Sequence, residues 1–181
     1  MAQADQERVR WLQELLERYE RPLVRYAFRM TGDLEMARDI VQDTFLQACR
    51  ADQAQINTHL QAWLYRVCRN RTLDVLKKEH RMQATDVQSL ETYPSNGRPP
   101  GEAAAGRETE SLVLAALAKL PGNQQEVFRL KFQDQLSYKE ISDVTGFPVH
   151  NVRYLLHTSL KTMREQLRGH FNLVRERQEQ P

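Results

Sequence analysis

The sequence predicts an all-α protein of two small helical domains, an N-terminal helix bundle and a C-terminal four-helix domain, joined by a flexible linker. Apolar residues recur at three- and four-residue spacing in both halves of the chain, and no stretch alternates as a strand would. Glycine and proline are absent between Gly32 and Pro94, but six of them lie within residues 87–110. Because glycine and proline interrupt helices, we expect domains at 1–86 and 111–181 and a linker at 87–110.

The composition excludes several classes of protein. The 181 residues, 40% of them apolar, are enough for two small cores, and the net charge of +2 predicts no partner by itself. The longest apolar run, Leu112–Ala118, is far shorter than the roughly 20 residues that a membrane-spanning helix needs. The amino terminus lacks a secretory signal, and Cys49 and Cys68 are expected to act as small apolar residues, which fits a cytoplasmic protein.

The first half is predicted to hold four helices. Asp33 follows a Thr31–Gly32 turn and is suited to cap the helix after it, because its carboxylate accepts from free backbone N–H groups. Residues 51–58 are polar and aperiodic, which predicts a loop. By the apolar spacing, the expected helices lie within residues 9–19, 23–30 and 34–45, and from His59 past Leu76.

The second half is predicted to end in a helix-turn-helix. Ser137 and Glu140 form a capping box at the start of a short helix, and Gly146 permits the turn that follows. Pro148 suits the first position of a longer last helix. A short capped helix, a tight turn and a longer helix are the parts of that DNA-binding motif. The expected helices are 111–120, 124–132, 138–144 and one that begins at Pro148.

The last helix is predicted to present a DNA-reading face. Its core stripe is expected to be Val149, Val152, Leu156, Leu160, Met163 and Leu167. The adjoining face, suited to base edges and phosphates, carries His150, Arg153, Tyr154, His157, Lys161, Arg164 and Arg168. A plainly solvated face is the alternative for such a charged stripe. His150 and His157 have no third ligand at a suitable spacing, so we expect no metal.

The helix from His59 predicts a second nucleic-acid surface. Residues 66–81 carry six basic and two acidic side chains, with the amide of Asn70 among them and the aromatic Trp63 just before them, a combination suited to single-stranded or melting DNA. The alternative is that Trp63 is simply buried and that the basic run solubilises a helix end. The expected core stripe is Leu60, Trp63, Leu64, Val67 and Val75, and the expected basic arc is Arg66, Arg69, Asn70 and Lys77.

The helix before it carries the opposite charge. Residues 33–52 have a net charge of −3, and Asp39, Gln42 and Asp43 are expected to lie side by side on its outer face. A protein partner suits this face better than DNA does, although a solvated face is the alternative.

In their order and their sequence motifs, these segments resemble a sigma factor of bacterial RNA polymerase, from the extracytoplasmic-function (ECF) group of the sigma-70 family. Residues 19–50, with Ala37-Arg38-Asp39-Ile40-Val41-Gln42-Asp43, are similar to the segment that binds the clamp helices of the largest polymerase subunit. Residues 62–78, with Ala62-Trp63-Leu64-Tyr65-Arg66, are similar to the segment that opens and reads the proximal promoter element. Residues 120–149 resemble the domain that reads the distal element.

The resemblance implies a dissociable specificity subunit that has no catalytic residue and no cofactor. Its partners would be core RNA polymerase, promoter DNA both double-stranded and melted, and an anti-sigma factor. Asn70 and the loop 51–60 would form the pocket for a flipped non-template base, and the linker would thread through the polymerase. The implied polymerase contacts are Asp39, Gln42 and Asp43; the proximal DNA contacts are Trp63, Arg66, Arg69, Asn70, Lys77 and Lys78; the distal contacts are His150, Asn151, Arg153, Tyr154, His157 and Lys161.

The recognition helix departs from the family at several positions. Leu155, Thr158 and Leu160 stand where basic residues often occur, and His150-Asn151 replaces the more usual Gly-Thr. This departure predicts an unusual distal sequence or a weak distal contact. The rival functions are a free-standing helix-turn-helix regulator and a helical protein-interaction adaptor. An enzyme is a poor alternative, because the sequence has no phosphate-binding glycine loop, no GxSxG and no HExxH.

Overall fold

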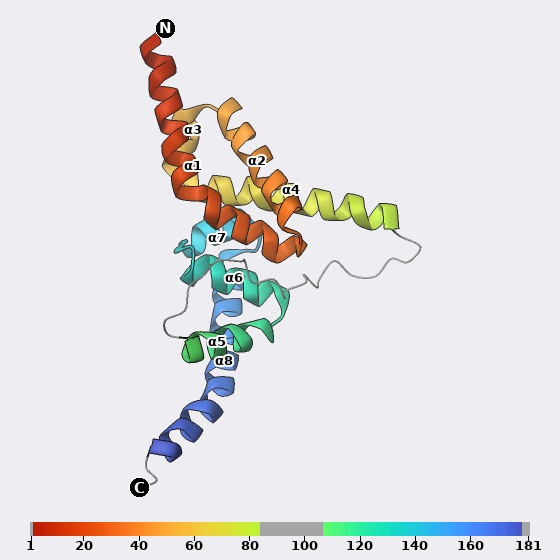
Figure 1. Ribbon diagram of the computed structural model, residues 1–181, viewed down its shortest axis with the longest axis vertical. Helices are drawn as coiled ribbons and strands as arrows, with labels where there is room; N and C mark the ends of the chain where they lie inside the picture. The colour runs from red at the N-terminus through yellow and green to blue at the C-terminus, as the bar shows by residue number, and fades with distance from the viewer. Residues whose placement is uncertain (1, 84–106, 179–181) are drawn as a thin grey trace. The chain divides into compact units, whose positions relative to one another are not determined.

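The computed structural model describes residues 2–83 and 107–178, and the regular structure in those residues is entirely helical (Figure 1). The helices form two compact units, made mainly of the helices before and after the predicted linker. The all-α prediction is therefore confirmed, and predicted linker residues 87–106 lie outside the described part of the chain. The elements are α1 (Ala2–Thr31), α2 (Leu34–Arg50), α3 (Gln53–Ile56), the 3-10 helix η1 (Asn57–His59), α4 (Leu60–Gln83), α5 (Arg107–Ala118), α6 (Gly122–Phe132), α7 (Tyr138–Thr145) and α8 (Val149–Gln178).

The two helices predicted within residues 9–30 are one continuous helix, α1. Pro22 lies inside it and supplies no N–H for the helical hydrogen-bond ladder, which is the usual cause of a bend such as the one visible partway along α1 in Figure 1. The helix continues through the proline because apolar residues on both sides of it are buried. These are Leu15, Tyr19, Leu23, Tyr26, Ala27 and Met30.

The core of the first unit lies where α1, α2 and α4 meet. Leu23 of α1, Ile40 of α2 and Leu64 of α4 are each almost fully buried. The rings of Tyr26 and Tyr65 meet edge to face, with their centroids 5.2 Å apart. The predicted cap of α2 is confirmed, because Met36 N donates to Asp33 Oδ1 at 3.0 Å. These contacts orient the outer faces of α2 and α4.

The loop predicted at residues 51–58 is instead two short helical turns, α3 and η1. Asp52 caps α3 by accepting from Ala54 N at 2.9 Å, and Ile56 is buried. A single buried apolar residue produces no periodic pattern, so the sequence carried no helical signal here.

The second unit is formed by α5 to α8. Its core contains Ala116, Leu117, Leu120 and Met163, and Phe128 packs against them. α5 begins at Arg107, before the predicted start at Ser111, so the last four residues of the predicted linker, 107–110, belong to this helix.

The turn chemistry predicted for the helix-turn-helix is present. Glu140 N donates to Ser137 Oγ at 3.2 Å, and Ser137 N donates to Glu140 Oε2 at 2.7 Å, which completes the capping box. Gly146 ends α7 with φ of +77°, a conformation that favours glycine. Pro148 stands just before α8 rather than at its first position, and its carbonyl accepts from Val152 N at 3.0 Å.

The core stripe of α8 differs from the predicted one at Leu160, and Val149 and Leu167 of that stripe are only half-buried. Leu160 is 39% exposed, whereas Leu155 and Ser159 are buried. Around the helix, Ser159 lies about 20° from the fully buried Val152, but Leu160 lies about 80° from it. Ser159 tolerates burial because its hydroxyl donates to the carbonyl of Leu156 at 2.8 Å.

Candidate nucleic-acid and protein interfaces

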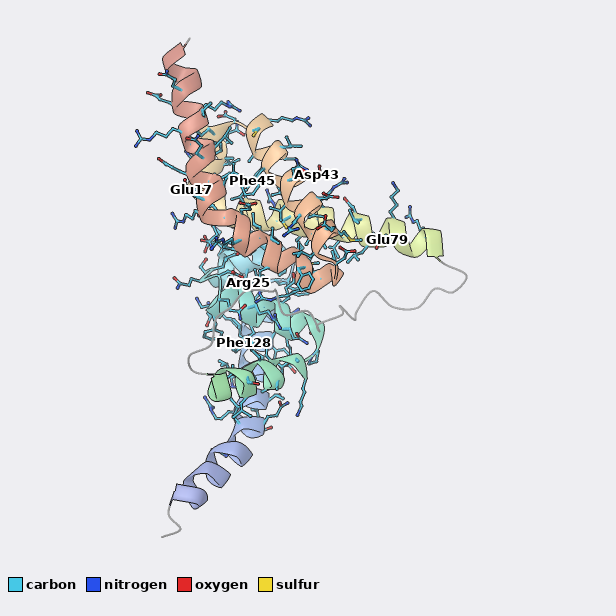
Figure 2. The ribbon with its side chains drawn as sticks, viewed as in Figure 1. Glu17, Arg25, Asp43, Phe45, Glu79 and Phe128 are labelled. Atoms are coloured by element: carbon cyan, nitrogen blue, oxygen red, sulfur yellow. The ribbon has the colours of Figure 1, made fainter. Side chains whose placement is uncertain are left out.

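The exposed face of α4 carries most of the predicted proximal DNA contacts. Arg66, Asn70, Lys77 and Lys78 are exposed, whereas Trp63 and Arg69 are half-buried. Arg69 already has an interaction partner within the protein, so it is less available than the others to bind DNA. The C-terminal part of α4 extends beyond α1 and α2, near Glu79 in Figure 2. This face therefore offers positive charge and an amide to an extended ligand.

The core stripe predicted for α4 is partly wrong. Leu60, Trp63, Val67 and Val75 are only half-buried. The helix instead buries residues on a neighbouring face, and of the predicted stripe only Leu64 is among them. The buried residues are Ala62, Leu64, Tyr65, Cys68 and Thr72.

Hydrogen bonds within the helices explain why polar residues occupy the interface of α2 and α4. Thr72 Oγ1 donates to the carbonyl of Cys68, and Thr44 Oγ1 donates to the carbonyl of Ile40, both at 2.8 Å. Burial raises the pKa of Cys68 to about 12, although hydrogen bonds from Thr44 and Thr72 act against that shift. The thiol is therefore neutral near pH 7 and serves the core, as the sequence predicts.

The outer face of α2 is acidic, as predicted. Asp39 and Gln42 are exposed, and Asp43 lies on the side of α2 that faces away from α1 (Figure 2). Asp43 is also paired, because Nε and Nη2 of Arg71 lie 2.8 and 2.7 Å from its Oδ2. Leu46 continues this face and is 46% exposed. Sequence reasoning missed Arg71 and Leu46; an apolar residue on the polar side of an amphipathic helix was the available signal for Leu46.

The predicted reading face of α8 is exposed in the first four turns of the helix. His150, Arg153, Tyr154, His157 and Lys161 are exposed, and Asn151 is half-buried. Tyr154 is 64% exposed, so its ring is accessible on this face. The structure thus brings together the residues that sequence reasoning assigned to this face.

Tyr138, at the start of α7, is a residue of this face that sequence reasoning missed. The cationic groups of Lys131 and Arg153 lie 5.2 and 5.8 Å from the centre of its ring. Both distances suit cation–π attraction. Lys131 is held further because its Nζ donates to the carbonyl of Leu136 at 3.1 Å. Tyr138 thus joins Arg153 of the reading face to the helix before the turn.

The three residues that stand where the family often has basic side chains, Leu155, Thr158 and Leu160, have different surroundings. Leu155 is buried in the core of the second unit. Thr158 Oγ1 donates to the carbonyls of Tyr154 and Leu155 at 2.9 and 3.0 Å, so its side chain bonds its own helix. Leu160 is exposed but uncharged. These three positions therefore add no cation for phosphates to the face.

Within residues 2–83 and 107–178, no group of three His, Cys, Asp or Glu side chains gathers as a metal site. None of the helices described there is long and apolar enough to cross a membrane.

Comparison with known proteins finds the same two units. Residues 15–82 match the family pattern "Sigma-70 region 2", and residues 111–163 match "Sigma-70, region 4". The chain is 28% identical over 164 residues to the ECF RNA polymerase sigma factor SigW of Bacillus subtilis, covering 86% of this chain and 88% of SigW. It is 24% identical over 163 residues to SigM of the same organism, covering 89% of this chain and 95% of SigM.

A solved structure shares the fold. The sigma factor RpoE of Bartonella quintana, in complex with the anti-sigma factor NepR, superposes with a TM-score of 0.61 at 19% identity. The match covers 86% of this chain and 96% of RpoE.

Proposed function

The chain belongs to the ECF group of the sigma-70 family of RNA polymerase sigma factors, and from this premise we propose which of its surfaces perform each step of transcription initiation. As a member of that family it is an initiation factor and not an enzyme, and it binds core RNA polymerase and promoter DNA. The two rival functions, a free-standing regulator and an adaptor, are therefore not needed to explain the charged surfaces of the two units.

We propose that the outer face of α2 docks on core polymerase. Asp39 and Gln42 are exposed there, Asp43 is held beside them by Arg71, and Leu46 adds exposed apolar area at the same face. Interfaces combine an apolar centre with a polar rim, and charged rims steer the partners together. An acidic face would repel DNA phosphates, so it suits a protein surface better.

The exposed face of α4 is proposed to hold the proximal promoter element and to help separate its strands. Arg66, Lys77 and Lys78 are free to contact phosphates, and the exposed amide of Asn70 can bond a base edge. Trp63 on the same helix is half-buried, and its exposed part can add an aromatic contact. The observation that carries the proposal is that α2 and α4 expose opposite charges from a single unit, so one unit can bind polymerase and DNA together.

The face of α8 is proposed to read the distal element with a modest affinity. Arg153 and Tyr154 are exposed in its second turn, where a recognition helix meets base edges. Because Leu155, Thr158 and Leu160 supply no charge, we expect fewer phosphate contacts and a shallow dependence of affinity on salt. The remaining proposed contacts are His150, Asn151, His157 and Lys161.

The wider organisation follows by analogy with the family. We propose functional domains at 1–86 and 111–181, with residues 87–110 between them, and action in the cytoplasm, where polymerase is found. We also propose an anti-sigma protein as the regulatory partner; the RpoE neighbour in fold was solved with one.

Reconstitution with core polymerase tests the assignment of α2. The variant Asp39→Asn should reduce co-elution with core polymerase, while Glu35→Gln on the same helix should not. Both variants remove one negative charge, but Glu35 lies in the first turn and pairs with Arg38 at 2.9 Å. Equal losses from the two variants would show that only net charge matters, and normal co-elution of Asp39→Asn would refute the assignment.

A further inference from the structure

The first turns of α1 lie outside the family pattern, yet they contact the segment between α2 and α4. The match to region 2 begins at residue 15, whereas α1 begins at Ala2. Arg8 and Trp11 are three residues apart, so they share one face of α1. Trp11 donates a hydrogen bond to that segment, Arg8 donates one to the last turn of α2 just before it, and Figure 1 shows α3 beside this part of α1.

Arg8 binds the end of α2. Its Nη2 donates to the carbonyl of Cys49, in the last turn of that helix. The last carbonyls of a helix lack helical donors and carry partial negative charge. Arg8 supplies both a donor and a positive charge, so it holds the point where the chain leaves α2.

Trp11 binds the other end of the segment. Its Nε1 donates to Oδ1 of Asn57, the first residue of η1, at 3.2 Å. An indole N–H only donates, so the amide oxygen must face Trp11 and the Nδ2 group must point elsewhere. Among the described residues no other hydrogen bond engages the Asn57 side chain. The hydrogen bond from Trp11 therefore leaves the Nδ2 group of Asn57 available to a ligand.

The segment between the two contacts is also held from inside. Ile56 is 6% exposed, and Asp52 caps the short helix α3. The side chains of Ala54, Gln55, Asn57 and Thr58 are exposed. Because this segment is held at both ends and by the buried Ile56, it loses little conformational freedom when it binds a ligand.

We propose that Arg8 and Trp11 are positioning residues for promoter opening. They hold residues 51–60 in the conformation that receives a non-template base, and they turn Nδ2 of Asn57 outward as a donor to acceptor atoms of that base. This inference rests on the proposed function, and it takes residues 51–60, the pocket for a flipped non-template base that the family resemblance implies, as the part of the chain that meets the melted strand. Arg8 and Trp11 themselves need no contact with DNA.

A charge-matched pair of variants tests the role of Arg8. Arg8→Gln and Arg10→Gln each remove one positive charge from the same part of α1, but Arg10 points to solvent and pairs with Glu14 at 3.3 Å. With reconstituted holoenzyme, Arg8→Gln should lower the equilibrium constant for promoter opening about three- to tenfold, the loss expected for one hydrogen bond. Arg10→Gln should stay within about twofold of the wild type. Equal effects from both variants would overturn the proposal.

A double-mutant cycle tests the role of Trp11. Trp11→Phe keeps an aromatic ring but removes the N–H, and it should lower opening about three- to tenfold with no change in polymerase affinity. In an Asn57→Ala background, Trp11→Phe should have no further effect, because the amide it orients is gone. Full additivity, or an equal loss of polymerase affinity, would overturn the positioning role.

The readout also separates this inference from the proposed function. Opening is followed by permanganate reactivity of promoter thymines, and the cycle is repeated with each non-template base changed in turn. A positioning role predicts that Trp11→Phe flattens the preference at one base position, which a general loss of stability would not do. If the wild-type holoenzyme opened no promoter, the proposed function itself would fail. If the wild type opened it and the preference were unchanged in Trp11→Phe, only the positioning role would fail.

Discussion

Exchanging Asp43 and Arg71 separates a polymerase contact from a contact that holds α2 to α4. Arg71 donates through both Nε and Nη2 to the same oxygen of Asp43, and the side chains are 45% and 40% exposed for Arg71 and Asp43. For a pair this exposed, we expect a contribution of about 0.2 to 1 kcal/mol to the free energy of unfolding. In a unit of this size, its loss should lower the melting temperature by about 1 to 8 °C.

The single variants and the exchange have different expected results. Asp43→Arg places two positive groups together, so it should destabilise the first unit and weaken polymerase binding. The double variant Asp43→Arg with Arg71→Asp restores opposite charges between α2 and α4, and most of the lost stability should return. Polymerase affinity should remain at least about tenfold lower, or about 1.4 kcal/mol, because the acidic face now carries a cation.

Tryptophan fluorescence provides the stability assay. The chain has two tryptophans, Trp11 and Trp63, and both lie in the first unit, so thermal unfolding followed by this signal reports on α1 to α4. Affinity is measured by titrating labelled protein with core polymerase. If the exchange restored polymerase affinity together with stability, Asp43 would act only within the protein, and its assignment to the interface would be refuted.

Three further predictions concern single positions. Asn70→Ala should weaken promoter opening by about 1 to 3 kcal/mol while polymerase binding stays unchanged, and unaltered permanganate reactivity would count against the base contact. Leu155→Arg should unfold the second unit, as followed by circular dichroism, because Leu155 is buried. Leu160→Arg should be tolerated and should steepen the salt dependence of distal-element binding by about one unit of slope. Similar outcomes for the two variants would contradict the burial of Leu155 and the exposure of Leu160. The raised pKa of Cys68, about 12, means that the contribution of this thiol to stability is full below the ordinary thiol pKa and is lost as the pH rises toward 12. Iodoacetamide at pH 8 should modify Cys49 well before Cys68. Rapid native modification of Cys68 would disprove this.

The sequence predicted those features that local chemistry determines. Asp33, the Ser137–Glu140 capping box and Gly146 each act through backbone groups a few residues away, so their types and spacing were sufficient. The exposed basic and acidic faces followed from helical spacing for the same reason. The order of these motifs along the chain then indicated the family that the comparisons show.

Features that depend on a packing partner were not predictable from spacing. Leu160 and Trp63 look like core residues on a helical projection, but Leu160 is exposed and Trp63 is half-buried, whereas Ser159 and Cys68 take interior positions. The pairing of Arg71 with Asp43 joins residues 28 positions apart, and that of Trp11 with Asn57 joins residues 46 apart. Neither contact produces a pattern in the local residue spacing of the sequence.

Site-specific photocrosslinking in the complex of holoenzyme and promoter tests the central claim most directly. A benzophenone side chain is placed at Gln42 on α2 and, in a separate protein, at Lys77 on α4; both positions are exposed. The account predicts that position 42 crosslinks to the polymerase and position 77 to promoter DNA. Crosslinking of position 42 to DNA, or of position 77 to polymerase alone, would contradict the division of these two faces.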